Sequence, residues 1–339
     1  MRTMRRAGVA AAAGGPPGGR SATAIAPVAV CRPRAPQPWR RLMPDLVLPR
    51  VHHLSAWDGP TLHVLEWPAP DGATGLPLLC LPGIVRTAAD FAVLAAGVGA
   101  GRRVVAVDYA GRGGSFRLPA GAAPARYGPE ACLRDVMDVA AALHLHRAVV
   151  VGTSFGGLLA MGLAAARPGL LAAVVLNDIG PEVGAGGAEF VRQFVATDPA
   201  LPDLDACVAY LRGLLPPLSL ADEAAWRAMA ALTYAPGADQ RWHPLWDTRI
   251  AALLDAPTPD LWPLFRALAS VPLLLVHGTV SDILTGETVV RMEAARLEAG
   301  AALRLVRVPG VGHAPTLAEP EVVAALGAFL AEVAPPGSG

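Results

Sequence analysis

The stretch Val-Val-Val-Gly-Thr-Ser-Phe-Gly-Gly at residues 149–157 decides the fold of this chain. A short β-branched run leads into Gly152, Ser154 and Gly156, and an Ala- and Leu-rich segment of helical character follows at once. A strand that turns sharply into a helix has a strained backbone and packs against neighbouring strands, where a Cβ would clash. Glycines therefore flank the serine, and its hydroxyl is pushed out above the sheet.

Ser154 in such a turn, called a nucleophile elbow, is placed to attack a carbonyl carbon. The Phe155 amide, at the helix start, points to where an oxyanion would form, and the positive end of the helix dipole strengthens it. The pattern Gly-x-Ser-x-Gly alone is weak, and a glycine-rich turn that merely contains a serine is the alternative. The strand before it and the helix after it favour the elbow.

The composition limits the class of protein. The 339 residues are 53% hydrophobic with a net charge of zero and no Lys, so we expect one large domain or two modest ones and no nucleic-acid partner. Cys31, Cys80, Cys132 and Cys207 are scattered without paired spacing, which predicts reduced thiols and no disulfide scaffold or metal site. The chain has no run of about 18 apolar residues, so a membrane span is not expected.

Residues 1–42 differ from the rest, with eight Arg, no Asp or Glu, and many Ala, Gly and Pro. This composition predicts a disordered extension, and Met43 is an alternative start. Arg5 and Arg6 before the apolar residues 7–13 suggest an export signal as the alternative. That apolar stretch is short and is followed by a glycine- and proline-rich segment, so we expect a cytoplasmic protein.

From residue 47 onward, short apolar runs alternate with helical patterns. Strands are predicted at residues 61–67, 76–81, 103–108, 171–176 and 271–276, in the β-branched run directly before Ser154, and in the strand and turn at 303–313. Helical segments are predicted at 88–96, at 129–143 and directly after Ser154. This alternation predicts an α/β fold with a mostly parallel central sheet covered by helices on both faces. Ligands in such sheets bind at the carboxyl ends of the strands.

Residues 181–262 interrupt the alternation. They are rich in proline, helical in character, and contain four of the seven tryptophans, so we expect a helical cap, or lid, inserted between core segments 43–180 and 263–335. Trp226 and Trp246 are candidate substrate-pocket residues in this cap. For any single tryptophan of the cap, however, packing within the cap's own core is the favoured interpretation.

A serine nucleophile needs a base, and the base needs a carboxylate that orients it. The strand and turn at residues 271–282 present Asp282, and the strand and turn at residues 303–313 present His313. Asp178 also follows a strand and is the alternative carboxylate. Either carboxylate gives the chain order Ser, Asp, His, and we expect Asp282 because it fits the Gly-x-x-x-Asp turn after its strand.

Together these segments resemble the α/β-hydrolase fold superfamily, in particular its capped serine hydrolases of the esterase, lactonase and carbon–carbon hydrolase kind. The matching motifs, in chain order, are Leu-Pro-Gly-Ile at 81–84, Asp-Tyr-Ala-Gly-Arg-Gly-Gly-Ser at 108–115, Gly-Thr-Ser-Phe-Gly at 152–156, Gly-Thr-Val-Ser-Asp at 278–282 and Gly-Val-Gly-His at 310–313. The resemblance implies Ser154 as nucleophile, His313 as general base and Asp282 as the residue that orients His313.

The resemblance also implies an oxyanion hole built from the backbone N–H groups of Ile84 and Phe155. Many relatives carry His-Gly where this chain has Pro82-Gly83. Arg112 is a candidate partner for a substrate carboxylate, but a structural role in its turn is the default interpretation. No cofactor or metal is implied.

The expected activity is hydrolysis of a small, largely apolar ester, thioester or lactone through an acyl-serine intermediate. Hydrolysis of a carbon–carbon bond in a vinylogous diketone by the same residues is an alternative. A non-catalytic ligand-binding protein is a third possibility from a different class. The sequence indicates neither the substrate nor the oligomeric state.

Overall fold

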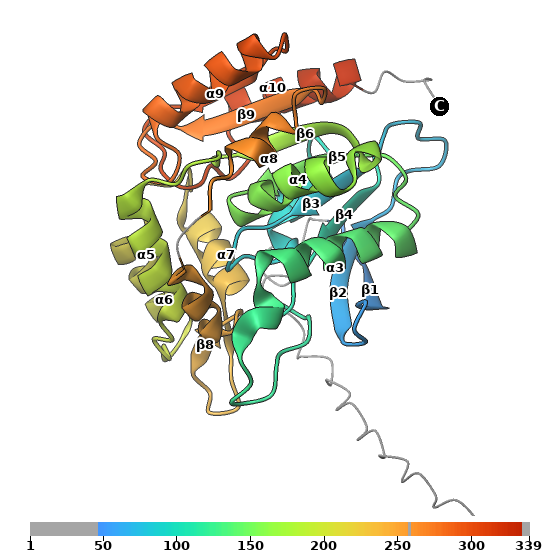
Figure 1. Cartoon of the computed structure of the whole chain (residues 1–339). Coiled ribbons are helices and arrows are strands. Elements are labelled where there is room, and N and C mark those ends of the chain that lie inside the picture. Colours follow the sequence, from blue (N-terminus) through green and yellow to red (C-terminus); the bar gives the residue numbers. More distant parts are fainter. Residues whose placement is uncertain (1–46, 257–258, 334–339) are drawn as a thin grey trace, which may run out of the picture. The chain divides into compact units, whose positions relative to one another are not determined.

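The computed structural model describes residues 47–256 and 259–333 (Figure 1). The predicted extension at 1–42, the alternative start at Met43, and Cys31 lie outside the described residues. Within them, the core is an α/β-hydrolase fold, as expected, with helices on both faces of a mostly parallel sheet.

The sheet has eight strands among the described residues, in the order β1-β2-β4-β3-β5-β6-β9-β10. All pairs from β4 to β10 are parallel, whereas β2 pairs antiparallel with both β1 and β4. The strands are β1 (Arg50–Ser55), β2 (Thr61–Trp67), β3 (Leu78–Leu81), β4 (Val104–Val107), β5 (Ala148–Thr153), β6 (Leu171–Asn177), β9 (Leu273–Gly278) and β10 (Arg304–Val308).

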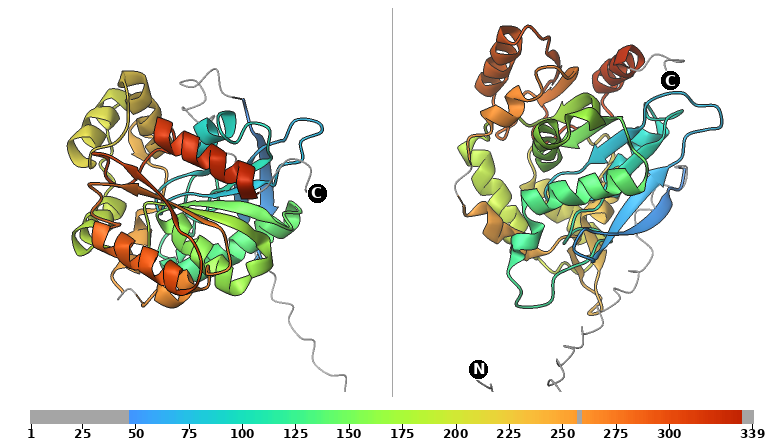
Figure 2. Two further views of the ribbon diagram at one scale, coloured as in Figure 1. Left: turned by 90° about the horizontal axis from the view of Figure 1, so that it is seen from above. Right: turned by 45° about the vertical axis from the view of Figure 1, so that its right-hand side comes forward.

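Alternate residues of the central strands face two different apolar layers, as the two-residue period of a strand requires. Leu79 and Val150 pack in one layer with helices α3, α4, α8 and α9, and Leu78 and Val149 pack in the other with α2 and α10. The left view of Figure 2 shows α10 and α9 on opposite sides of the sheet. The core helices are η1 (Ala88–Phe91), α2 (Ala92–Ala96), η2 (Pro124–Tyr127), α3 (Pro129–Ala142), α4 (Phe155–Ala166), η3 (Pro168–Leu170), α8 (Trp262–Arg266), α9 (Gly286–Glu298) and α10 (Pro320–Val333).

Residues 181–262, called the insertion below, lie between β6 and β9 in the chain, and their helices α5 to α7 and strand β8 gather at the lower left of Figure 1. Their elements are α5 (Ala185–Ala196), α6 (Leu204–Leu214), α7 (Glu223–Thr233), β7 (Tyr234–Pro236), β8 (Trp242–Pro244) and η4 (Thr248–Leu254). The insertion is therefore not purely helical, because β7 and β8 form a two-stranded antiparallel sheet. Asp203 and Asp222 cap α6 and α7 by accepting hydrogen bonds from Ala206 N and Ala225 N.

The strand predictions agree with the structure to within a few residues at each end. Edge strand β1 was not predicted. Its side chains are exposed or half-exposed, so its sequence lacks the apolar pattern of a buried strand. In the described part of the chain, no helix has the length and apolar character needed to cross a membrane.

Three cysteines lie in the described part of the chain, and all are buried free thiols. Burial raises the pKa of Cys132 to about 11 and that of Cys207 to about 12. Burial raises the pKa of Cys80 further still. Because the thiolate is the reactive form, these side chains are chemically inert in the folded protein.

We therefore expect iodoacetamide at pH 8 to leave Cys80, Cys132 and Cys207 unmodified in the native protein and to modify all three in urea. Peptide mapping by mass spectrometry reads each site separately. Rapid alkylation of any of the three in the native state would show that its surroundings open to solvent.

Candidate active site

The turn at Ser154 has the strained geometry that its flanking glycines predict. Ser154, between β5 and α4, has φ 51° and ψ −119°, a backbone conformation that costs energy in a residue with a Cβ. A Cβ on Gly156 would lie 1.9 Å from the Leu81 carbonyl oxygen of β3, and one on Gly152 would lie 2.5 Å from the Gly156 carbonyl oxygen. Neither position can accept a side chain, which confirms the steric argument from the sequence.

Ser154 is the first member of a hydrogen-bonded chain of three side chains. Its Oγ lies 2.8 Å from Nε2 of His313, and Nδ1 of the same ring lies 2.8 Å from Oδ2 of Asp178. The His313 side chain is 16% exposed, whereas the Asp178 side chain is fully buried. The imidazole thus joins a hydroxyl that faces a cavity to a carboxylate shielded from water.

The carboxylate at His313 is Asp178, so the expectation of Asp282 is corrected. Strand β6 lies directly between β5, which leads to Ser154, and β9, and Asp178 is the first residue beyond β6. Its φ of 54° turns the chain at once. Its Oδ1 accepts a hydrogen bond from Gly278 N at 2.9 Å, which fixes the carboxylate while Oδ2 faces the imidazole.

Asp282 lies four residues beyond the end of β9 and is exposed. Its turn packs against the start of the insertion: Gly184 N donates to the Ile283 carbonyl at 3.0 Å, and a Cβ on Gly184 would lie 2.2 Å from the Asp282 carbonyl oxygen. The Gly-x-x-x-Asp turn is therefore a docking point for the insertion and does not reach His313.

Asn177 ties the loop that carries His313 to the elbow. Its Nδ2 donates to the Pro315 carbonyl at 2.9 Å and to Thr153 Oγ1 at 3.2 Å. The side chain is buried, and its Oδ1 has no hydrogen-bond partner among the described residues. Asn177 was not predicted from the sequence, although its place at the end of β6, directly before Asp178, was the available signal.

The two expected oxyanion donors lie beside Ser154. Phe155 is the first residue of α4, and Ile84 follows the Pro82-Gly83 turn after β3. A Cβ on Gly83 would lie 3.7 Å from Cβ of Ser154, so this loop passes next to the elbow. In the described part of the chain, neither amide donates to another protein group. Their role in an oxyanion hole stays a prediction.

Arg112 does not face the pocket, which corrects its candidate role toward a substrate carboxylate. The side chain is 1% exposed. Its Nε donates to the Ile84 carbonyl at 2.8 Å and its Nη1 to the Ala110 carbonyl at 2.8 Å. Arg112 therefore holds the loop that contains Ile84, the structural alternative that the sequence left open.

The two candidate tryptophans of the insertion also lie outside the pocket lining. Trp246 is 1% exposed, and its Nε1 donates to the Val195 carbonyl at 2.9 Å. Trp226 packs in the same apolar cluster of the insertion, with the Arg212 guanidinium 5.1 Å from its ring centre. Both residues stabilise the insertion itself, so their expected contact with substrate is corrected.

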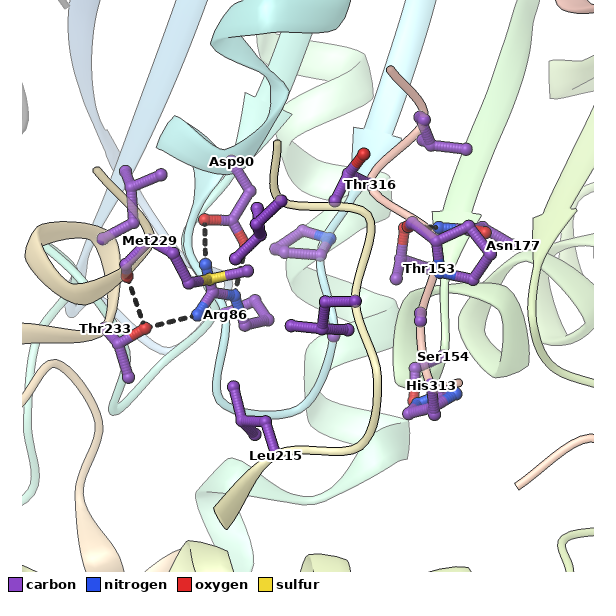
Figure 3. A pocket seen from close by; sticks show the side chains of 18 of the residues that line it. Arg86, Asp90, Thr153, Ser154, Asn177, Leu215, Met229, Thr233, His313 and Thr316 are labelled. Carbon is purple, nitrogen blue, oxygen red and sulfur yellow. Dashed lines mark hydrogen bonds and ion pairs between the residues drawn. The ribbon is translucent and has the colours of Figure 1, made fainter. Parts of the chain in front are cut away.

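Ser154 and His313 open into a cavity of about 460 Å³ (Figure 3). The core loops after β3, β5 and β10 form one part of its wall, and the insertion forms the rest. The larger apolar side chains from the insertion are Phe190, Val191, Phe194, Leu211, Leu215, Leu218, Leu220, Met229 and Leu232. A mostly apolar chamber of this size accommodates a short aliphatic chain.

The insertion is hydrogen-bonded to the His313 loop. Gly312 N donates to the Pro217 carbonyl at 2.7 Å, next to His313 itself. Glu319 Oε1 accepts from Ser219 Oγ at 2.5 Å and from Thr316 N at 2.7 Å. The segment between α6 and α7 is thus part of the site, because it is bonded to the loop that presents the imidazole.

One polar group of the pocket wall was not predicted at all. Arg86, on the loop after Ile84, pairs with Asp90 of η1 and bonds Thr233 of α7. The spacing of four between Arg86 and Asp90 was the only signal in the sequence. Among the described residues, no group of three His, Cys, Asp or Glu side chains could hold a metal ion.

The geometry and the comparisons agree on the class of protein. A model of the alpha/beta hydrolase family matches residues 78–326. The chain belongs to this family and is a hydrolase.

Among curated proteins it is similar to the 3-hydroxybutyrate-oligomer hydrolase of Cupriavidus necator, with 32% identity over 270 residues, which cover 76% of this chain and 89% of that protein.

Solved structures support the same family. An alpha/beta hydrolase from Novosphingobium aromaticivorans is 35% identical, covers 84% of this chain and 99% of its own, and superposes with a TM-score of 0.76. An E-2-(acetamidomethylene)succinate hydrolase is 25% identical, covers 83% of this chain and 98% of its own, and has a TM-score of 0.69.

Two substitutions test which carboxylate orients His313. We expect Asp178→Asn to slow labelling of Ser154 by a fluorophosphonate by about 10⁴-fold, because an amide at Nδ1 favours the wrong imidazole tautomer. The matched Asp282→Asn variant should react within about twofold of wild type, since its side chain is exposed. Rates are read by gel fluorescence, and the reverse ranking would restore Asp282.

Arg112→Met tests the structural role of Arg112. The Ile84 and Ala110 carbonyls would lose their donor, and we expect the free energy of unfolding in urea to fall by about 1–3 kcal/mol. The exposed Arg147→Met serves as control and should change it by less than about 0.5 kcal/mol. A stable variant that loses turnover of acidic substrates only would contradict this role and support carboxylate binding.

Proposed function

We propose that this protein is a serine hydrolase that cleaves small, largely apolar carboxylic esters, thioesters or lactones, with Ser154, His313 and Asp178 as its catalytic triad. The observation that carries the proposal is the pair of hydrogen bonds from one imidazole to Ser154 Oγ and to the buried Asp178 carboxylate. Nucleophile, base and orienting acid in this arrangement define acyl transfer through serine.

The reaction follows from these contacts. His313 Nε2 takes the Ser154 proton as Oγ bonds to the carbonyl carbon, and the resulting oxyanion accepts hydrogen bonds from the Ile84 and Phe155 amides. The imidazolium then protonates the departing alcohol, thiol or ring oxygen, which leaves an acyl-serine. Water then attacks the acyl-serine and gives one proton to His313 Nε2, and the imidazolium passes this proton to Ser154 Oγ as the acid leaves with the other proton of the water. Asp178 keeps its charge and stabilises the imidazolium.

Short 3-hydroxyacyl esters are the substrates that the similarities favour. The relative from Cupriavidus necator is named for oligomers of 3-hydroxybutyrate, and this chain covers most of its length. The apolar wall and the volume of about 460 Å³ suit acyl chains of this size. We also propose that the insertion closes over the acyl chain as a lid and that the protein acts in the cytoplasm.

Hydrolysis of a carbon–carbon bond uses the same three side chains, so it is the competing hypothesis for this site. A purely ligand-binding role is set aside, because the chain belongs to a hydrolase family and its relatives are named as hydrolases. Turnover of matched substrates distinguishes hydrolysis of an ester from hydrolysis of a carbon–carbon bond.

Ser154→Ala tests the proposal directly. We expect it to abolish fluorophosphonate labelling and to lower turnover of p-nitrophenyl butyrate by about 10⁶-fold, the size of effect known for loss of a catalytic serine. Ser281→Ala, which changes a serine outside the pocket, should leave both unchanged. Continued labelling of the Ser154→Ala variant would overturn the assignment of the nucleophile.

The same preparation then separates the two reactions. Turnover of p-nitrophenyl butyrate and of a 3-hydroxybutyrate dimer, with no cleavage of a vinylogous 1,5-diketone, is the expected result. Preferential cleavage of the diketone would contradict the ester assignment.

A further inference from the structure

The pocket wall carries one charged pair in a mostly apolar surface. Arg86 Nε and Nη2 donate to the two carboxylate oxygens of Asp90 at 2.6 and 2.8 Å, and Arg86 Nη1 donates to Thr233 Oγ1 at 2.6 Å. The side chains of Arg86 and Asp90 are 20% and 21% exposed. All three residues line the same cavity as Ser154 and His313.

These three bonds leave part of the guanidinium unused. An arginine has five N–H donors, and the bonds to Asp90 and Thr233 occupy one on Nε, one on Nη1 and one on Nη2. One N–H on each terminal nitrogen remains for a group in the cavity. Thr233 has no donor to spare, because its hydroxyl donates to the Met229 carbonyl at 2.7 Å.

The charge of the wall favours an uncharged partner for those donors. Asp90 balances Arg86 through two contacts. Among the described residues, two further carboxylates lie near the cavity: Asp178 behind His313, and Glu319, which is bonded to Ser219 and Thr316. An anionic ligand at Arg86 would therefore lie beside Asp90 without a net positive charge to stabilise it. A carbonyl oxygen can accept the free N–H groups at no such cost.

Arg86 and Ser154 lie on neighbouring parts of the cavity wall. A Cβ on Gly83 would lie 3.2 Å from Arg86 Cγ and 3.7 Å from Ser154 Cβ, so both side chains start beside the same glycine. They then diverge: Figure 3 shows Arg86 with Asp90 and Thr233 on one side of the pocket and Ser154 with His313 on the other. The space between them is where an acyl chain bound to Ser154 would extend.

We propose that the Arg86–Asp90 pair binds a second, uncharged carbonyl oxygen on the acyl chain, a few bonds from the carbonyl that Ser154 attacks. The pair thus selects acyl chains with an ester at the 3-position over purely hydrocarbon chains. The proposal rests on the proposed function, because it needs the scissile ester at Ser154. Arg86 is a specificity-determining residue in this account and takes no part in bond cleavage.

A matched pair of substrates isolates the carbonyl. p-Nitrophenyl 3-acetoxybutyrate and p-nitrophenyl 3,5-dimethylhexanoate have nearly the same shape, but the second replaces the acetoxy group with isobutyl. We expect wild type to favour the acetoxy ester in kcat/KM by about tenfold or more, the effect of one hydrogen bond to a charged donor. A wild type without this preference would overturn the proposal.

The double variant Arg86→Met/Asp90→Leu removes both charges together, so that no unpaired charge is left in the wall. We expect the preference to disappear, with kcat/KM for the hydrocarbon ester within about threefold of wild type. Thr233→Val is the matched control: it removes the bond to α7 but keeps the charged pair, and it should retain the preference. Equal losses for both substrates would overturn the proposal and assign Arg86 a structural role.

Arg86→Lys covers the case in which the double variant does not fold. Lysine keeps the charge but loses the planar fork, so we expect the preference to fall by several-fold, and an unchanged preference would contradict the proposal.

The mono-p-nitrophenyl ester of glutaric acid supplies an anionic competitor substrate; its turnover above that of the acetoxy ester would overturn the choice of an uncharged group. Failure of wild type to hydrolyse any ester, with no fluorophosphonate labelling, would refute the proposed function instead.

Discussion

The close approach of Gly156 to the end of β3 is the contact on which the rest of the site depends. A Cβ there would lie 1.9 Å from the Leu81 carbonyl oxygen, so α4 can begin directly against the sheet only because the residue is glycine. This contact aligns three features at once. It holds Ser154 at positive φ, it brings the first amide of α4 to the sheet edge, and it places the Pro82-Gly83-Ile84 loop beside the serine.

The order of strands, and not the order of residues, decides which carboxylate meets the imidazole. β6 is the neighbour of β5, so a residue immediately after β6 is at the right edge and the right distance for a histidine that approaches Ser154. Asp282 follows β9, the strand beyond β6, and its turn is hydrogen-bonded to the first residues of the insertion. The buried carboxylate of Asp178 is tolerated in the core because both of its oxygens are hydrogen-bonded, Oδ1 to Gly278 N and Oδ2 to His313 Nδ1.

Local patterns in the sequence predicted what depends on local constraints. The apolar runs and the glycines around Ser154 identify strands, helix and elbow, because side-chain period and Cβ clashes act over a few residues. The roles of Asp282, Arg112 and Trp246 could not be predicted in this way. Each depends on a partner far along the chain: Arg112 on the Ile84 carbonyl, Trp246 on the Val195 carbonyl. A residue type that fits a function also fits a buried structural bond, and only the partner distinguishes the two.

Two arginines near Ile84 illustrate that distinction. Arg112 and Arg86 both flank Ile84, but Arg112 is buried and its guanidinium is surrounded by backbone carbonyls and the Cys132 sulfur. Arg86 shares its charge with Asp90 at the surface of the cavity and keeps N–H groups directed at no protein atom. Burying a charged pair in an apolar chamber is costly unless its remaining donors are satisfied. When substrate displaces water from this chamber, the free N–H groups of Arg86 must find an acceptor on the substrate or lose their hydrogen bonds, so the pair penalises a purely hydrocarbon chain as much as it rewards an oxygenated one.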